Sequence, residues 1–372
     1  MYSVYAVLPT SGTTVIYDDR LMGNEYRLID PKLELAVNSA GTFTVSIPPT
    51  NIAYSSLTCF TTDLYITRDG TVIWYGRVIN ESLDFWNNRR ITCEGALAFL
   101  NDTVQPHWDN GGYDVRQFIS YVLGVHNGRH SDGLANSHQI FCGNVTVSDT
   151  TYSIWSVDGE TTLECIQKYV IDKFGGFLSI RRDSSNQLLL DCLKSARKTA
   201  KQQIRFGSNL LDFSKTLSMT DLCTCVYPRG EKREDGTYLT VKNTDAADGS
   251  IYVKSDTGIA NYGLVERTVD WPNVTDADVL FELAQTYLES SQFADLSIDI
   301  SAVDLHSVFD FEEAIDLGDR VRCVSEPHGM NADFMVTKIS LPLDQPDKTV
   351  YSLTSEEKLS VSSTISSILA KK

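Results

Sequence analysis

Three of the six histidines gather within one short stretch, as His126, His130 and His138. A metal or catalytic site built from two histidines four residues apart needs a helix that carries both on one face, with a carboxylate beside them. Glycines expected to interrupt such a helix are frequent here, namely Gly124, Gly128 and Gly133. The sequence therefore predicts that these histidines lie in a loop and hold no metal.

Paired acids and exposed aromatic side chains are the next groups that suggest chemistry. Two carboxylates flank the scissile bond in glycosidases, and Glu312-Glu313 and the acids between Asp344 and Asp347 fall in expected loops. With 49 acidic residues, however, chance pairs are common. An aromatic surface that binds sugars is a further possibility, but Trp74, Tyr75 and Trp86 fall on expected strands and are predicted to fill the core.

No motif of an established catalytic class occurs in the sequence. There is no Gly-x-Ser-x-Gly turn, no phosphate-binding loop ending in Gly-Lys-Ser/Thr and no His-Glu-x-x-His helix. The eight cysteines are spread along the chain, and Cys223 and Cys225 lack the two-residue gap of zinc and redox motifs. We therefore predict reduced core thiols, no catalytic residues, no cofactor and no metal, and a protein that is not an enzyme.

The charge balance limits the possible partners. The formal net charge is −17, from 32 Lys and Arg against 49 Asp and Glu. Binding of nucleic acid or of anionic lipid needs clustered basic residues, and none cluster here. No apolar run reaches the length of a membrane span, and no signal peptide opens the chain. We expect no sequence-specific nucleic-acid binding, no membrane segment, and folding in a cytoplasm.

The elements that position these residues begin with a β region over residues 1–101. Short runs with alternating apolar residues follow one another, and Asp69-Gly70 between two such runs is a strong hairpin signal. About six strands at regular spacing indicate a barrel or a sandwich. Residues 102–206 differ, because apolar residues at helical spacing alternate with strands there, with a helix capped near Thr161 and Glu164. That part is predicted to be α+β.

The second half returns to β structure. Leu296, Ile298 and Ile300 alternate with polar residues, and the turn at Leu317-Gly318-Asp319 leads into further alternating strands. We predict a second, discontinuous β domain over 207–230 and 296–357. An insertion over 231–295 is expected to hold two strands, Tyr238–Val241 and Ser250–Val253, and a helix capped by Asp276. Residues 358–372 are expected to form a terminal helix or tail.

The predicted fold class is therefore α+β and mainly β, with two barrel-like domains flanking an α+β domain and a small insertion. Two β domains with similar strand counts suggest an internal repeat at the level of the fold.

Eight short stretches resemble the tail hub family of long-tailed phages and prophages, also described as prophage tail endopeptidases, tail-associated lysins or minor structural proteins. They run in family order over nearly the whole chain, as Leu28–Leu35 with Ala40–Phe43 and Ile47–Pro49, Trp74–Val78, Gly95–Asp102, Val125–Asn127, Lys173–Leu178, Asn209–Asp212, Pro228–Gly230 and Leu317–Val321. Each stretch is a turn with part of a strand, and the resemblance rests on the order in which the eight stretches follow one another.

The resemblance implies a structural hub at the distal end of a phage tail, located in the virion and assembled in the host cytoplasm. Each chain of a homotrimer gives two tube domains, so three chains match a six-fold tube ring above a three-fold tip. The implied partners are the distal tail protein or tail tube ring, the tape measure protein in a channel that later passes DNA, and a tip or receptor-binding protein at the C-terminus.

The resemblance leaves two other functions open. Many relatives continue into a peptidase or glycan-cleaving domain, whereas this sequence ends after a Ser-rich stretch at Lys372. We therefore do not carry over the lytic activity, but a tail-associated peptidoglycan hydrolase that depends on Glu312 or Asp344 is one alternative. A receptor- or glycan-binding tail protein that uses Trp86 or Trp108 is the other.

Overall fold

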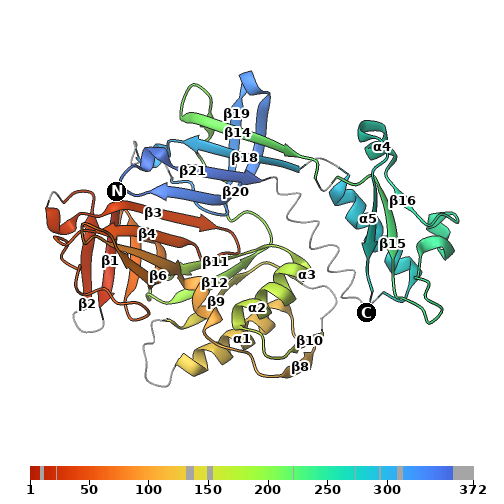
Figure 1. The fold of residues 1–372 in the computed structure, drawn as a ribbon, viewed down its shortest axis with the longest axis horizontal. Coiled ribbons are helices and arrows are strands. Elements are labelled where there is room, and N and C mark those ends of the chain that lie inside the picture. Colours follow the sequence, from red (N-terminus) through yellow and green to blue (C-terminus); the bar gives the residue numbers. More distant parts are fainter. Residues whose placement is uncertain are drawn as a thin grey trace.

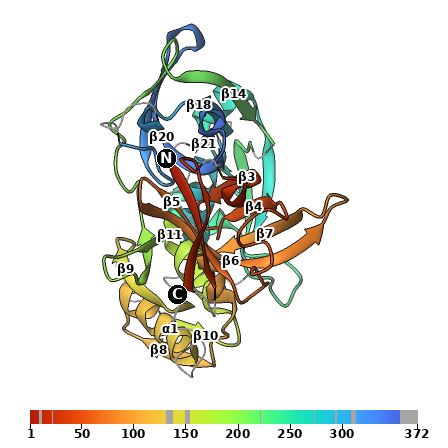
Figure 2. The same ribbon diagram turned by 90° about the vertical axis from the view of Figure 1, so that its left-hand side faces the viewer.

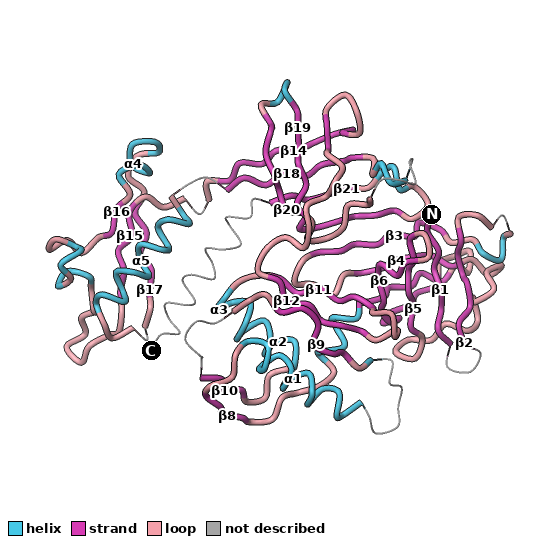
Figure 3. The backbone as a smooth tube through the Cα atoms, turned by 180° about the vertical axis from the view of Figure 1, so that it is seen from behind, coloured by secondary structure: helices cyan, strands magenta, loops and turns pink. Residues whose placement is uncertain are grey.

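The computed structural model describes residues 1–8, 12–21, 23–130, 138–148, 154–220, 222–272, 274–292, 295–307 and 313–354. A large curled sheet dominates the molecule, and a mixed α/β part packs beneath it (Figure 1). A small third part, made of three strands and two α-helices, stands apart at one end. The same separation is visible from behind (Figure 3). The predicted mainly-β fold is confirmed.

The first β region contains seven antiparallel strands. They are β1 (Tyr2–Leu8), β2 (Gly12–Asp18), β3 (Ile29–Ala36), β4 (Thr42–Ile47), β5 (Asp63–Arg68), β6 (Thr71–Leu83) and β7 (Arg89–Gly95). Their order in the sheet is β2-β1-β5-β6-β7-β4-β3. Asp69 and Gly70 join β5 to β6 with φ angles of 49° and 79°, as expected for the primed hairpin turn that Asp-Gly favours.

The second β region uses six strands. They are β13 (Ile204–Arg205), β14 (Leu210–Ser218), β18 (Asp295–Ala302), β19 (Arg320–Ser325), β20 (Met330–Pro342) and β21 (Val350–Thr354). Five of them follow the antiparallel order β19-β20-β21-β18-β14, and β13 adds to β19 in parallel. Because β13 already belongs to this region, the region begins before residue 207, where we had predicted its start.

The two regions repeat one strand order. In chain order, strands β3 to β7 form the path β5-β6-β7-β4-β3, and strands β14, β18, β19, β20 and β21 form the path β19-β20-β21-β18-β14. The fourth strand of each set, β6 or β20, is 13 residues long. Its pairing with the fifth strand shifts register in both cases, between Val78 and Asn80 and between Val336 and Lys338. The structure thus contains two copies of one five-stranded unit.

The two copies join edge to edge instead of forming separate barrels. Lys32–Ala36 of β3 pair with Lys338–Pro342 of β20, so one sheet runs through both copies. A single apolar core follows it, from Val4 and Phe43 in the first region to Ile300 and Tyr351 in the second. The prediction of two separate barrel-like domains therefore needs correction, because β3 leaves an edge that β20 covers.

The middle part packs helices against two small sheets. Its elements are η2 (Ala96–Asn101), β8 (Trp108–Gly111), α1 (Val115–His130), β9 (Ile140–Val145), β10 (Ile154–Val157), α2 (Thr162–Ile166), the π-helical η4 (Gln167–Ile171), α3 (Asp172–Phe174), β11 (Phe177–Arg182) and β12 (Leu188–Leu193). The rings of Phe118 and Trp155 stack at 4.1 Å in its core. Thr161 and Glu164 form the predicted capping box of α2.

The insertion has its own core and a different start from the predicted one. Its elements are β15 (Cys225–Arg229), β16 (Val253–Lys254), α4 (Asp256–Tyr262), β17 (Glu266–Asp270) and α5 (Ala277–Ser291). Since β15 pairs only with β16 and β17 among the described strands, it belongs here and not to the second β region, where the boundary at residue 230 had placed it.

Two further predictions concern the insertion. Tyr238–Val241 is not a strand. Its last residue begins the 3-10 helix η5 (Val241–Asn243), and a second 3-10 helix, η6 (Asp245–Ala247), follows. Of the second predicted strand, Ser250–Val253, only Val253 is β, as the first residue of β16. The side chain of Asp276 accepts hydrogen bonds from the first turn of α5, as predicted.

The remaining described elements are short 3-10 turns, η1 (Asn24–Tyr26), η7 (Leu305–Ser307), η8 (Glu326–His328) and η9 (Pro346–Lys348). The expected terminal helix over 358–372 lies outside the described residues. Among the helices of the described ranges, none is both apolar enough and long enough to span a bilayer.

Candidate functional site

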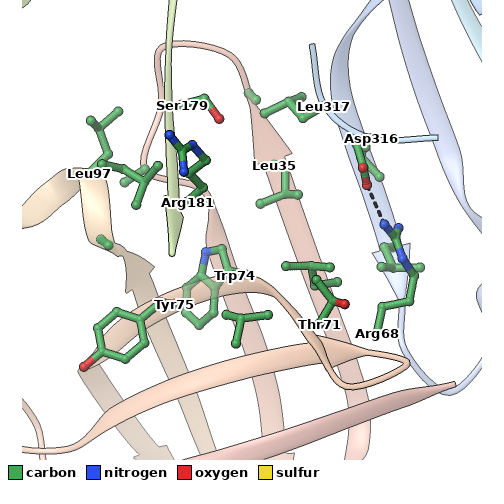
Figure 4. Close-up of a pocket in the computed structure, with 18 of the residues that line it drawn as sticks. Leu35, Arg68, Thr71, Trp74, Tyr75, Leu97, Ser179, Arg181, Asp316 and Leu317 are labelled. Carbon is green, nitrogen blue, oxygen red and sulfur yellow. Dashed lines mark hydrogen bonds and ion pairs between the residues drawn. The ribbon is translucent and has the colours of Figure 1, made fainter. Parts of the chain in front are cut away.

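The Leu317-Gly318-Asp319 turn lies where the two β regions and the middle part meet. A cavity of about 310 Å³ adjoins it, and its walls come from β3, β6 and β11 as well as from the turn itself. Figure 4 shows Arg68 and Asp316 joined on one side of this cavity, with Leu35, Trp74 and Arg181 around it. We call the turn from Asp316 to Asp319, together with Arg68 and Arg197 that bind it, the joint.

Two arginines hold the joint together. The Arg68 Nη2 of β5 lies 2.6 Å from Asp316 Oδ1, and Arg197 Nη2 lies 2.8 Å from Asp316 Oδ2. Arg197 also approaches Asp319 Oδ1, at 3.3 Å. Asp316, in the turn of the second β region, is thus bound both by the first β region, through Arg68, and by the segment that follows β12, through Arg197. The pair with Arg68 is the more shielded from water, because the Arg68 side chain is only 15% exposed whereas Arg197 is exposed, so the Arg68 pair is expected to be stronger than a surface pair.

The two acids of the turn respond to this environment in opposite ways. Burial alone raises the pKa of Asp316, but the charges of Arg68 and Arg197 outweigh it and hold the pKa below its usual value. Asp319 is fully buried, and burial raises its pKa to about 6 against the opposing charge of Arg197. Neighbouring carboxylates whose pKa values move apart are often functional, but a structural ion-pair network gives the same pattern.

The backbone of the turn explains its glycine. Gly318 adopts a φ of 82°, and its N–H donates to Val336 O at 2.9 Å, while Val336 N–H donates to Asp319 O at 2.9 Å. A Cβ on Gly318 would lie 2.8 Å from the ring of Phe177 on β11. The turn therefore needs glycine both for its conformation and for its close approach to the middle part.

The first β region has a counterpart of this turn. Phe60 N–H donates to Val78 O at 2.7 Å, and Val78 N–H donates to Thr62 O at 3.1 Å, which resembles the pattern around Val336 but has one more residue between the two bonded positions. Here a phenylalanine adopts the positive φ, 63°, and its side chain is 60% exposed. The same turn is thus buried in one copy and exposed in the other.

The histidine cluster differs from its prediction. Helix α1 continues through Gly124 and Gly128 to His130, so His126 and His130 lie one turn apart on a helix and not in a loop. Packing of α1 against the middle core outweighs the propensity cost of the two glycines. The prediction gave too much weight to the helix-breaking tendency of Gly124 and Gly128.

The contacts of the histidines are structural. His126 is fully buried, its Nδ1 lies 2.7 Å from Thr103 Oγ1, and burial lowers its pKa to about 4. His138 Nε2 lies 3.0 Å from Asp63 Oδ1 and so connects the middle part to β5. Among the described residues, no three His, Cys, Asp or Glu side chains gather closely enough to hold a metal ion.

Two of the candidate acids, Glu313 and Asp344, are exposed. Glu312 lies outside the described residues, and Glu313 Oε1 binds Lys201 Nζ at 3.0 Å. Asp344 is exposed in the loop before η9. The eight cysteines are free, and six of them are buried, as predicted for reduced core thiols.

One aromatic prediction is wrong. Trp74 and Tyr75 are buried as expected, but Trp86 lies exposed at the end of the β6–β7 hairpin, next to the equally exposed Phe85. Asp84 Oδ1 accepts hydrogen bonds from the N–H groups of Trp86 and Asn88, each at 2.8 Å, and so forms the turn. The cluster of Asp and Asn around Trp86 was the overlooked turn signal. Trp108 is half-buried and stacks on Tyr121 at 4.1 Å.

Comparison with known proteins gives one family and several related folds. Residues 197–364 match the family model described as Prophage endopeptidase tail. The 43 kDa tail protein of prophage MuSo2 from Shewanella oneidensis superposes with a TM-score of 0.64 at 13% identity, covering 96% of this chain and 99% of its own. No curated protein sequence matches the chain.

Two other solved structures agree in fold over nearly the full length of both chains. The tail protein from Neisseria meningitidis MC58 has a TM-score of 0.60 at 13% identity, covering 98% of this chain and 99% of its own. Prophage tail protein gp18 from Listeria monocytogenes EGD-e has a TM-score of 0.56 at 12% identity, covering 99% of both chains.

The family match and these folds together support a phage or prophage tail family, so the resemblance seen in the sequence is confirmed. The prediction that it is not an enzyme stays a prediction, because the description of the matched family includes an endopeptidase.

Proposed function

We propose that this chain is the hub at the distal end of the tail, a homotrimer that adapts a six-fold tube to a three-fold tip and gates the channel for the tape measure protein and DNA. The repeated strand order supports this proposal most directly, because two copies of one unit per chain give six similar units in a trimer. The acidic net charge of −17 is compatible with a channel that DNA passes without binding.

The joint has a clear part in such a hub. A ring that transmits force during injection must keep its two units at a fixed angle, and the ion pairs of Arg68 and Arg197 with Asp316 connect the units across the shared sheet. The site is then a structural connection, whose role is to fix orientation.

The test is the mass of the full chain in solution. We expect a trimer, alone or after addition of the distal tail protein and the tail tube protein of the same phage. Light scattering that finds only a monomer alone and with both partners would contradict the proposal. A two-dimensional electron-microscopy average of the assembly should show six similar units around one pore.

A second candidate is a wall-degrading tail enzyme, which the description of the matched family favours. Zymography on peptidoglycan separates the two functions. A clearing zone that Asp344→Asn or Glu312→Gln abolishes would replace the structural proposal, whereas we expect no clearing from either the wild-type chain or the variants.

A further inference from the structure

Several strand edges of the large sheet lack a strand partner among the described residues, and two of them are related by the repeat. The first is the outer edge of β14, which ends the sheet and pairs only with β18. The second belongs to the distal half of β6. On one side β6 pairs with β7 up to Leu83, but on the other side β5 ends its pairing at Arg77. Unpaired strand edges present free N–H and C=O groups to another chain.

The repeat shows what these two edges correspond to. In the second copy, β19 covers the first half of β20, and β3 covers the second half of that same edge, from Lys338 to Pro342. In the repeat, β6 corresponds to β20 and β14 corresponds to β3. The unpaired half of β6 and the unpaired edge of β14 are therefore equivalent to the two strand edges that pair in the β3–β20 junction.

The exposed side chains agree with this correspondence. If the register shifts of β6 and β20 are aligned, Leu83 corresponds to Leu341 and Phe85 to Leu343. Leu341 and Leu343 are only 5% and 1% exposed, and Leu343 N–H donates to Pro31 O beside β3. Leu83 and Phe85, by contrast, are 65% and 87% exposed. The positions are thus buried in the copy where β3 covers the strand edge, and exposed in the copy where no such strand is present.

The two edges cannot be expected to meet within one chain. Figure 2 shows the β6–β7 hairpin extending away from the rest of the sheet, and β14 ends the sheet on the side of the second copy. Six strands, from β18 through β7, lie on the sheet path between β14 and β6. The partner of each edge must then come from another molecule.

We infer that β14 of one copy of this chain adds to the distal half of β6 of the next copy, as an antiparallel strand that repeats the β3–β20 junction. The occupant is a second copy because the chain itself already contains both sides of this contact, in matching register. The inference rests on the proposed homotrimer and deepens it by assigning the interface. Because the contact joins two different surfaces, it is heterologous and builds a ring when the rotation closes.

The correspondence also fixes the register. Within the chain, Ser340 lies opposite Glu34. Ser340 corresponds to Ser82, and Glu34 corresponds to Thr216, because each lies at the same distance along its own pairings. Between copies, Ser82 is therefore expected opposite Thr216. Directly opposite residues of an antiparallel pair have Cβ atoms about 4.5–5.5 Å apart, close enough for a disulfide after small adjustment.

Cysteine cross-linking of the full chain tests this register. The variant Ser82→Cys, Thr216→Cys is expected to give covalent dimers and trimers under mild oxidation, at concentrations where light scattering shows the trimer. The single variants and the register-shifted pair Ser82→Cys, Leu217→Cys serve as controls, because successive residues of a strand point to opposite faces of the sheet. Cross-links in the shifted pair but not in the first pair would overturn the register.

A second variant tests the surface without depending on disulfide geometry. Phe85→Asp places a charge on an exposed side chain, so the monomer should fold normally, but the trimer should weaken by at least about tenfold in its dissociation constant. Leu264→Asp, at a similarly exposed leucine in the insertion, is the matched control and should leave assembly unchanged.

The two proposals fail in different ways. One outcome is that the full chain forms a trimer by mass that Phe85→Asp does not weaken and in which the Ser82→Cys, Thr216→Cys variant gives no cross-link. That result would overturn this interface but leave the proposed hub unaffected. A chain that stays monomeric alone and with its tail partners would overturn both.

Discussion

The two turns that precede the third strand of each copy have similar backbone hydrogen bonds but opposite surroundings. In the second copy, Gly318 packs against Phe177 and its neighbour Asp316 binds two arginines. In the first copy, Phe60 takes the positive φ in an exposed loop, with only Arg77 over its ring at 4.8 Å. One turn is thus buried as an internal joint, while its counterpart is exposed.

This difference shows how a duplicated fold acquires two roles. The strand order, the long fourth strand and the register shift are common to both copies. What differs is the side chains at equivalent places and whether another strand of the chain covers the edge of the fourth strand. The predictions below test that contrast, starting from the largest effect.

Substituting the glycine of the joint should have the largest effect. Gly318→Val places a Cβ against Phe177 at a φ that β-branched residues avoid, so we expect a loss of about 3 kcal/mol in the free energy of unfolding. Chemical denaturation measures it. The matched change at the counterpart turn, Thr61→Val, is on an exposed residue and should alter stability by less than about 0.5 kcal/mol. Equal losses at both sites would refute the contrast.

Removing the charge that the two arginines share should come next. Asp316→Asn leaves Arg68 and Arg197 close together without their carboxylate, and we expect a loss of about 2 kcal/mol. The control Asp333→Asn breaks an exposed pair with Arg322 and should cost less than about 0.5 kcal/mol. Denaturant midpoints of the two variants give the comparison, and a smaller loss for Asp316→Asn than for the control would contradict our assignment of the joint.

The pH dependence of stability should separate the two acids. The folded-state pKa of Asp319 is raised to about 6, so its stabilising contribution is complete below pH 3.8 and is lost as the pH rises through 6. Asp319→Asn should remove that fall in stability between pH 4 and 6.

Asp316 is expected to act with the opposite sign. Its pKa is lowered in the folded chain, so its contribution is present above pH 3.8 and is lost as the pH falls further. Asp316→Asn should therefore keep the fall between pH 4 and 6 that Asp319 causes. Urea unfolding at a series of pH values measures both, and an unchanged profile in Asp319→Asn would exclude Asp319 as its source.

The smallest effect is expected at the exposed turn. Phe60→Gly relieves a positive φ but gives the unfolded chain more freedom and removes the contact with Arg77, so the terms nearly cancel. We expect a change within about 1 kcal/mol in thermal unfolding. A loss of stability as large as that of Gly318→Val would mean that the exposed turn stabilises the fold as much as the buried one.

Much of the local structure followed from the sequence. The Asp69-Gly70 hairpin, the capping box of Thr161 and Glu164 and the cap at Asp276 are set by residues close together in the chain. Their physical causes are short-range, because a positive φ or an unpaired N–H is satisfied by the next few residues. The period-two alternation of β4 and β19 likewise gave the buried face of each strand correctly.

Predictions that depended on packing were less successful. Helix α1 runs through two glycines because its apolar face is buried, and Trp86 is exposed because Asp84 turns the chain before the strand reaches the core. The joint was not predicted at all. Arg68 and Asp316 are 248 residues apart, and no spacing rule connects residues at that distance.

By itself, the sequence determined the kind of element at most positions, the fold class and the resemblance to tail proteins, because alternation, caps and turns act over a few residues. Only the tertiary structure decided that β3 pairs with β20, that one core serves both copies, and which turn is buried. Strand edges select partners through main-chain groups that every residue shares, so their choice depends on which edges the folded chain brings together.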